Sequence, residues 1–264
     1  MSIIIPFGIL FPYIRILHQK NMSNSTEEFI DFLFDVHGGL DQWNSFSKLT
    51  AQLKIGGLTW SVKGHEGKLD NVNFEMYLRR QEASFSPFIL ENQRSVFTPD
   101  RVAIQSFGGK VLKELFNPRE TFEGHEIQTP WNKMQLIYFS SYATWSYLVT
   151  QFLFRWPGFQ VSEIEPWDEN GEQWRRLVVI FPEYLAYHSK KQIYYFDDSG
   201  HLKRHDYWPE ILGGAAATQY TENYCTFNGI NIGTSRKVFI LNEDNSIQPE
   251  PVLVTLEIEN LNFS

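Results

Sequence analysis

The chain has 264 residues, 42% of them hydrophobic and 20% charged, with a formal net charge of −8. This length and hydrophobic content predict a folded protein with a sizeable core, and they exclude a disordered chain. The acidic balance argues against a nucleic-acid partner, because such a protein needs a basic surface to neutralise phosphates.

Residues 1–22 are predicted to be a poorly defined extension that contributes little to the fold. The apolar run at residues 3–17 contains Pro6 and Pro12, which interrupt a helix, and the run is too short to span a bilayer. No basic segment precedes it and no small-residue cleavage site follows it, so no signal peptide is recognised and a cytoplasmic location is expected. The alternative is a weak anchor that gives peripheral membrane contact.

Residues 23–264 are predicted to form one domain that begins with a helix and continues as a sheet. Apolar residues recur at helical spacing between residues 29 and 36, and Gly38-Gly39 ends the pattern. From residue 49 to residue 106 apolar and polar residues alternate, which predicts a meander of antiparallel strands. The first strand is expected to run through residues 49–64, with a bulge or bend at Gly56-Gly57.

The middle of the chain differs, because residues 134–154 contain no charged side chain and have the length of a membrane span. Serine, threonine and glutamine residues lower the hydrophobicity of this segment, however, and their polar groups are costly to place in the hydrocarbon of a membrane. We therefore predict one or two buried or lid-like helices near residues 132–155, inserted into the sheet, and no integral membrane span.

The second half returns to alternation, interrupted by hairpin turns. Residues 197–200, with the sequence DDSG, and the pair Asn228-Gly229 are typical of tight connections between antiparallel strands. Strands and helices do not alternate as they do in a parallel sheet. The predicted class is therefore mainly β (α+β), with a strongly curved antiparallel sheet, an N-terminal helix and a helical insertion.

The segment at residues 201–206 crowds two histidines, an aspartate, a lysine and an arginine into consecutive positions. On a helix His201 and His205 could share a metal ion, but the aromatic residues and the turn before them predict a strand. Residues four apart on a strand are separated by about 13 Å, and Asp206 points away from His205. Neither a metal site nor a His–Asp dyad is therefore predicted here, and no cofactor is expected.

Two interpretations of this strand remain open. It can belong to a hairpin with one solvated face, or it can present His205 and Tyr207 to a cavity. In a cavity these side chains would act as polar contacts for an apolar ligand, or as a general acid and base.

This order of elements resembles the bacterial lipoprotein-carrier (LolA/LolB-like) fold. The segment from FDDSGHLKRHDY to ATQYTENYCTFNGINIGTSRKVF is similar to the closing pattern of that family, in which Y-x-x-F-x-G-I runs through a hairpin. The resemblance implies a half-open barrel around an apolar cavity, with helices near 132–155 covering the mouth. Residues 37–43, 164–177 and 196–214 are also similar to segments of uncharacterised bacterial proteins of similar length, which implies no chemistry.

The function predicted from these features is binding of a hydrophobic small molecule (lipid, terpenoid or polyketide-like). Aromatic residues make up 16% of the chain and can line such a cavity. The residues expected to bind the ligand are Tyr194, Tyr224, Trp145, Phe139 and Tyr142. The alternative is a cofactor-free cyclase or isomerase that acts on an apolar substrate in the same cavity, with His205 and Tyr207 as acid–base groups. A third possibility is a partner-binding module whose aromatic residues form a solid core.

Overall fold

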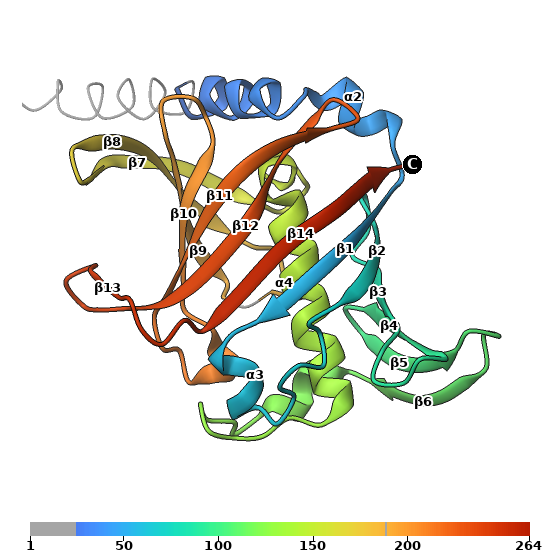
Figure 1. Ribbon diagram of the computed structural model, residues 1–264. Coiled ribbons are helices and arrows are strands. Elements are labelled where there is room, and N and C mark those ends of the chain that lie inside the picture. The colour runs from blue at the N-terminus through green and yellow to red at the C-terminus, as the bar shows by residue number, and fades with distance from the viewer. Residues whose placement is uncertain (1–24, 188) are drawn as a thin grey trace, which may run out of the picture.

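One antiparallel sheet organises the part of the chain that the computed structural model describes, residues 25–187 and 189–264 (Figure 1). Within these residues, fourteen strands join in the order β6-β5-β4-β3-β2-β1-β14-β12-β11-β10-β9-β8-β7, with β13 paired to β12 off this path. The sheet is open, since β6 and β7 form its two edges. The mainly β, antiparallel class is thus confirmed, while the predicted extension at residues 1–22 lies outside the described residues.

The helical elements are residues 25–36, α2 (Leu40–Ser45), α3 (Leu58–Val62), α4 (Lys133–Leu153) and the 3-10 turns η1 (Pro118–Phe122) and η2 (Glu210–Leu212). The strands of the first half are β1 (Lys48–Gly56), β2 (Val72–Tyr77), β3 (Ala83–Ser86), β4 (Gln93–Thr98), β5 (Arg101–Ser106) and β6 (Val111–Phe116). Those of the second half are β7 (Gln160–Glu169), β8 (Glu172–Ile180), β9 (Lys191–Phe196), β10 (Leu202–Tyr207), β11 (Ala217–Phe227), β12 (Ile230–Leu241), β13 (Ile247–Gln248) and β14 (Val254–Phe263).

The two predicted hairpin turns form as their residues dictate. Gly200 has a φ of 81° and donates its N–H to the Asp197 carbonyl at 2.9 Å, which closes the β9–β10 turn. Asn228 and Gly229 both have positive φ, at 51° and 83°, as a two-residue connection between twisted strands requires. A Cβ on Gly200 would lie 2.9 Å from the Phe32 ring, so the helix at residues 25–36 packs directly on this turn.

Two elements of the first half differ from the prediction. The strand expected through residues 49–64 ends at Gly56, and the following residues form α3. The Trp60 side chain on α3 is buried, and the N–H groups of Leu58 and Thr59 donate to the carbonyls of Val252 and Leu253, both at 3.0 Å. Tertiary contacts therefore override the alternating pattern. Strand β6 was not predicted; it is an edge strand, and nearly all of its residues are exposed, so burial imposes no pattern on it.

The helix predicted near residues 132–155 is present as the single helix α4. A capping box starts it: the Asn132 side chain accepts the N–H groups of Met134 and Gln135, and the Gln135 side chain accepts the Asn132 N–H. Every residue of α4 after Lys133 is buried. No helix in the described residues is both long and apolar enough to cross a bilayer.

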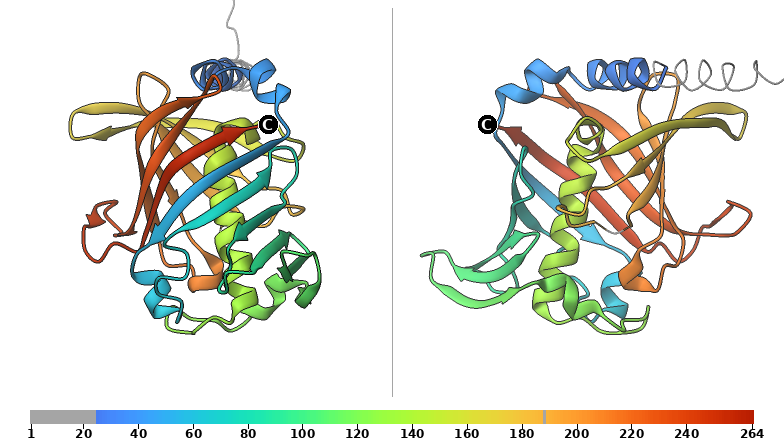
Figure 2. Two further views of the ribbon diagram at one scale, coloured as in Figure 1. Left: turned by 45° about the vertical axis from the view of Figure 1, so that its right-hand side comes forward. Right: turned by 180° about the vertical axis from the view of Figure 1, so that it is seen from behind.

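Helix α4 lies across one face of the sheet, which we call the inner face (Figure 2). It contacts β3, β4 and β5 near one edge of the strand order. It also reaches the other half of the sheet, since the Tyr147 carbonyl accepts from Arg236 of β12, and Thr150 lies against Tyr194 of β9. The core is therefore centred on α4, which fills the space that faces both halves of the sheet.

Candidate functional site

Polar side chains gather on the inner face where β9, β10 and β11 meet α4. Tyr194, His205 and Gln219 lie side by side across these three strands, because His205 is paired with both of the others in the sheet register. All three side chains are buried. Tyr207, two residues after His205 on β10, shares the same face. The alternation predicted for this strand is thus confirmed for His205 and Tyr207.

His205 is held between two tyrosine rings, with its ring centroid 4.2 Å from that of Tyr194 and 4.7 Å from that of Tyr207. Its Nε2 lies 2.6 Å from Oε1 of Gln192, which also accepts the Tyr194 hydroxyl at 2.6 Å. The Gln192 amide nitrogen donates to the Ser189 carbonyl, which fixes the orientation of the amide. An amide oxygen can only accept, so Nε2 of His205 carries a hydrogen and does not serve as a base.

The tyrosines of this cluster are neutral hydrogen-bonding groups. The Tyr207 and Tyr147 hydroxyls lie 3.3 Å apart. Burial raises the pKa of Tyr147 to about 12, and it raises the pKa values of Tyr207 and Tyr194 well above their usual value. None of these phenols therefore ionises near neutral pH, and the tyrosines act as neutral hydrogen-bond donors and acceptors.

A gap lies beside this cluster, between α4, α3 and the inner face of β1 and β14. It is lined by Ile55, Trp60, Phe139, Ser140, Ala143, Thr144, Tyr147, Val254 and Leu256. The volume of the gap is about 10 Å³, which holds about one water molecule at most. A drug-sized ligand needs roughly 300–1,000 Å³, so the aromatic residues around the gap are packed as core in this structure.

Three of the predicted ligand-binding residues lie at or near this region. Phe139 lines the gap itself. The Tyr142 ring packs against Phe139 with centroids 5.5 Å apart, and Tyr142 is close enough to Tyr207 to affect the pKa of that residue. Tyr194 belongs to the His205 cluster. The structure therefore brings these residues together along one side of α4.

Trp145 and Tyr224 lie elsewhere. The Trp145 indole N–H donates to the Tyr77 carbonyl at 2.8 Å, which ties α4 to the end of β2. The Tyr224 ring stacks on His201 at 4.0 Å, and its hydroxyl donates to the Leu202 carbonyl at 3.0 Å. Neither residue lines the gap.

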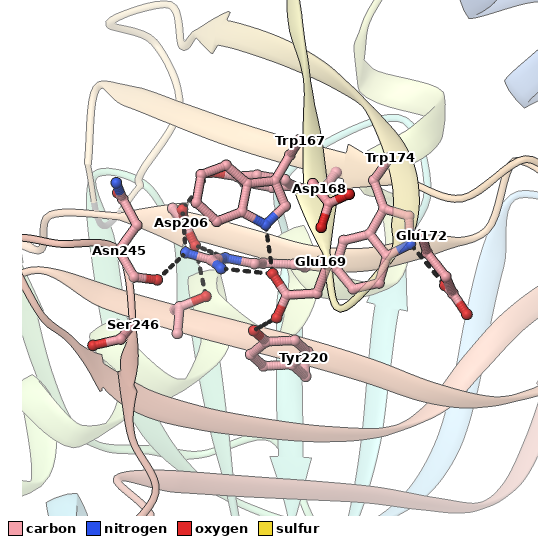
Figure 3. A network of polar contacts seen from close by, with 12 residues as sticks. Trp167, Asp168, Glu169, Glu172, Trp174, Asp206, Tyr220, Asn245 and Ser246 are labelled. Carbon is pink, nitrogen blue, oxygen red and sulfur yellow. Dashed lines mark hydrogen bonds and ion pairs between the residues drawn. The ribbon is translucent and has the colours of Figure 1, made fainter.

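The opposite face of β10 carries a second polar network, in which Arg204 is paired with Asp206 at 2.8 Å and with Glu169 at 3.1 Å (Figure 3). Residues from the β7–β8 hairpin and from the segment before β13 cover it. The remaining contacts to its two carboxylates come from Trp167, Tyr195, Thr218 and Tyr220. The expectation of a solvated hairpin face is thus wrong, because remote segments bury both faces of this strand.

One side chain that is important for the inner face, that of Arg236, was not predicted from the sequence. Its guanidinium reaches α4, donating to the Tyr147 carbonyl at 2.6 Å and to the Thr221 hydroxyl at 3.0 Å. The alternation of β12 contains a signal for it, since Arg236 falls in phase with Ile232 and Val238, which are buried. Within the described residues no His, Cys, Asp and Glu side chains gather as a metal site.

Comparison with known proteins gives a fold but no established activity. No protein-family model and no curated protein matches the chain. A DUF1329 family protein from Desulfovibrio piger is 10% identical, covers 90% of this chain and 93% of its own, and has a TM-score of 0.51.

Two further solved structures resemble the chain. A LolA superfamily protein from Nitrosomonas europaea is 7% identical, with 90% and 93% of the two chains covered and a TM-score of 0.49. A putative outer membrane lipoprotein-sorting protein domain from Vibrio parahaemolyticus is 10% identical, with 85% and 89% covered and a TM-score of 0.46. The names of both structures belong to the lipoprotein-carrier group that the sequence resembles, and likenesses at identities this low concern the fold alone.

Proposed function

We propose that the chain binds a hydrophobic small molecule, of the lipid, terpenoid or polyketide class, between α4 and the inner face of the sheet. In this proposal the open sheet acts as a half-open barrel and α4 covers its mouth. The fold and the sequence resemblance to lipoprotein carriers agree with this proposal. The observation that carries it is the gap beside α4, a small space of about 10 Å³ at the seam between the helix and the sheet.

The chemistry of the seam suits an apolar ligand. On the helix side the gap is lined by the small residues Ser140, Ala143 and Thr144 together with Phe139 and Tyr147. The sheet side includes Ile55 and Leu256. Small side chains on a helix leave room that a ligand can occupy once the helix moves outward by a short distance. The aliphatic and aromatic side chains opposite provide the apolar surface whose burial drives binding.

Ligand entry requires the gap to widen, and a few polar contacts oppose this. Residues 181–187, which we call the strap, leave β8 and reach the turn between β2 and β3. There the Gln81 amide donates to the Ala186 carbonyl at 2.8 Å and accepts the Ala186 N–H at 2.7 Å. Arg119 donates to the Tyr187 carbonyl at 3.3 Å. We propose that the strap joins the two halves of the sheet and that its release admits the ligand.

The proposal assigns His205 and Tyr207 to the polar edge of the binding region rather than to proton transfer. The hydrogen on Nε2 of His205 is donated to Gln192, and Tyr207 stays neutral. No contact in the described residues specifically favours a cyclase or isomerase, so we propose binding without chemistry.

Uptake of the apolar dye Nile red, followed by fluorescence, tests this function. Replacing Ala143 by Leu fills the gap and should abolish uptake. Gln52→Ala, at an exposed pair outside the gap, is the control and should bind as the unchanged protein does. Melting temperatures of both variants establish that they are folded, and the smaller Ala143→Val change serves if the Leu variant is not. Dye binding that is equal in all variants would contradict a site at this seam.

A further inference from the structure

Two arginine side chains are almost fully buried in the described residues, Arg204 with 1% and Arg236 with 4% of its surface exposed. They lie on opposite faces of the sheet and differ in their partners. Arg204 is neutralised by the carboxylates of Asp206 and Glu169. This pairing is what a buried guanidinium requires, because an isolated charge in a protein interior is costly.

Arg236 lacks such a partner among the residues that the structure describes. Its two hydrogen bonds go to a neutral carbonyl and a neutral hydroxyl, of Tyr147 and Thr221, and its Nε has no partner. The Tyr147 ring, 5.9 Å away, gives a weak cation–π contact. Burial lowers the pKa of Arg236, but an arginine side chain in a protein stays charged at neutral pH.

A second donor without a partner lies on the neighbouring strand. Gln219 is buried, its side chain lies beside the Tyr147 hydroxyl, and its amide nitrogen has no hydrogen-bond partner. The inner face therefore presents two N–H donors without an acceptor, from Arg236 and Gln219, and both side chains lie close to Tyr147. Buried donors without acceptors, one of them charged, form the complement of an anion.

The charge of that anion follows from its surroundings. His37 interacts electrostatically with Arg236, and burial lowers the pKa of His37 to about 4, so this imidazole is neutral at pH 7. One positive charge remains, and one negative charge balances it. A monoanion thus fits the site better than a dianion.

The sheet register connects this charge to the gap beside α4. Arg236 on β12 is paired with Leu256 on β14, which is paired with Ile55 on β1. Leu256 and Ile55 line the gap. One row of the inner face therefore has a guanidinium at one end and an apolar surface at the other. This arrangement matches an amphiphile, which has a charged head group and an apolar chain.

We infer that the ligand is a single-chain amphiphile with a carboxylate head group, such as a long-chain fatty acid. Its carboxylate pairs with Arg236 and Gln219, and its hydrocarbon chain lies in the widened gap along Leu256, Ile55 and Phe139. This inference rests on the proposed function, since it assigns a chemical class to the molecule bound at the same seam.

Titration with oleate and with methyl oleate, below the concentrations at which either aggregates, tests the inference by calorimetry or by displacement of Nile red. The two molecules share the hydrocarbon chain and differ in the head-group charge. The unchanged protein should bind oleate roughly ten- to one-hundred-fold more tightly, as expected for a charge-assisted hydrogen bond in a buried site. Arg236→Met should bind both molecules equally, and Arg236→Lys should retain a preference for oleate.

The outcomes separate this inference from the proposed function. Equal binding of oleate and methyl oleate by the unchanged protein would overturn the carboxylate assignment and leave apolar binding in place. Binding of neither molecule, and of no Nile red, would overturn the proposed function itself. A preference for oleate that survives in Arg236→Met would place the head group elsewhere. If the Met variant does not fold, Arg236→Gln provides the same neutral test.

Discussion

The two buried arginines make a stability prediction that requires no ligand. Arg204→Met leaves the buried carboxylate of Asp206 without the guanidinium that donates to both of its oxygens, at 2.8 and 3.1 Å. Breaking a buried pair from one side costs about 3–5 kcal/mol, because the remaining charge stays desolvated. The Tyr195 and Thr218 hydroxyls still donate to this carboxylate, so we expect a loss near the lower end of the range.

Arg236→Met should behave differently. The substitution removes two hydrogen bonds to neutral groups, each with a net value of about 1 kcal/mol. It also removes a buried charge that no carboxylate balances, and methionine occupies much of the space of the aliphatic stem. These effects oppose each other, so the free energy of unfolding should stay within about 1 kcal/mol of that of the unchanged protein.

Urea denaturation of the three proteins, followed by tryptophan fluorescence at pH 7, measures both changes. The Arg204 variant should unfold at a clearly lower urea concentration and the Arg236 variant near the original midpoint, with similar slopes. A loss of more than about 3 kcal/mol in Arg236→Met would show that this arginine is compensated in solution as fully as Arg204. The reasoning that leads from its missing counter-ion to an anionic ligand would then be refuted.

Three further predictions concern the strap, a histidine and a glycine. Gln81→Ala leaves both backbone groups of Ala186 unsatisfied, which should cost about 2–4 kcal/mol of stability and speed Nile red uptake in stopped-flow fluorescence; Gln52→Ala, at a surface pair, is the control that should change neither. The folded pKa of His37, about 4, lies below its unfolded value of 6.5, so its contribution is complete above pH 6.5 and is lost on acidification. The unfolding free energy should therefore fall by about 1.4 kcal/mol per pH unit more in the unchanged protein than in His37→Gln between pH 6.5 and 4, and equal slopes would contradict this. Gly38→Ala should lower the melting temperature sharply, because the added Cβ would lie 2.2 Å from the Gly229 carbonyl oxygen at a φ of 106°; an unchanged melting temperature would show that the turn adapts.

The features that could be predicted from the sequence are those set by local chemistry. The β9–β10 and β11–β12 turns followed from Gly200 and from Asn228-Gly229, whose backbone requirements do not depend on distant residues. The separation of His205 from Asp206 followed from the two-residue period of a strand. Both predictions hold in the structure because each depends on only a few neighbouring residues.

The features that could not be predicted depend on remote segments. Burial of the Arg204 face results from the β7–β8 hairpin, which supplies Glu169 from 35 positions earlier in the chain. Whether the predicted cavity is open or closed depends on how closely α4 packs against β1 and β14. No local sequence pattern determines that distance. Arg236 was missed although its phase on β12 was readable, because arginine in a strand is usually exposed.

Native mass spectrometry of the purified protein tests the central claim, binding of an apolar molecule at the seam beside α4, most directly. The account predicts a species heavier than the bare chain, loss of the added mass on extraction with organic solvent, and its replacement by one oleate per chain. The same experiment on Ala143→Leu should show the bare chain alone. The account would be contradicted if the unchanged protein appeared only at the mass of its chain and took up neither oleate nor Nile red.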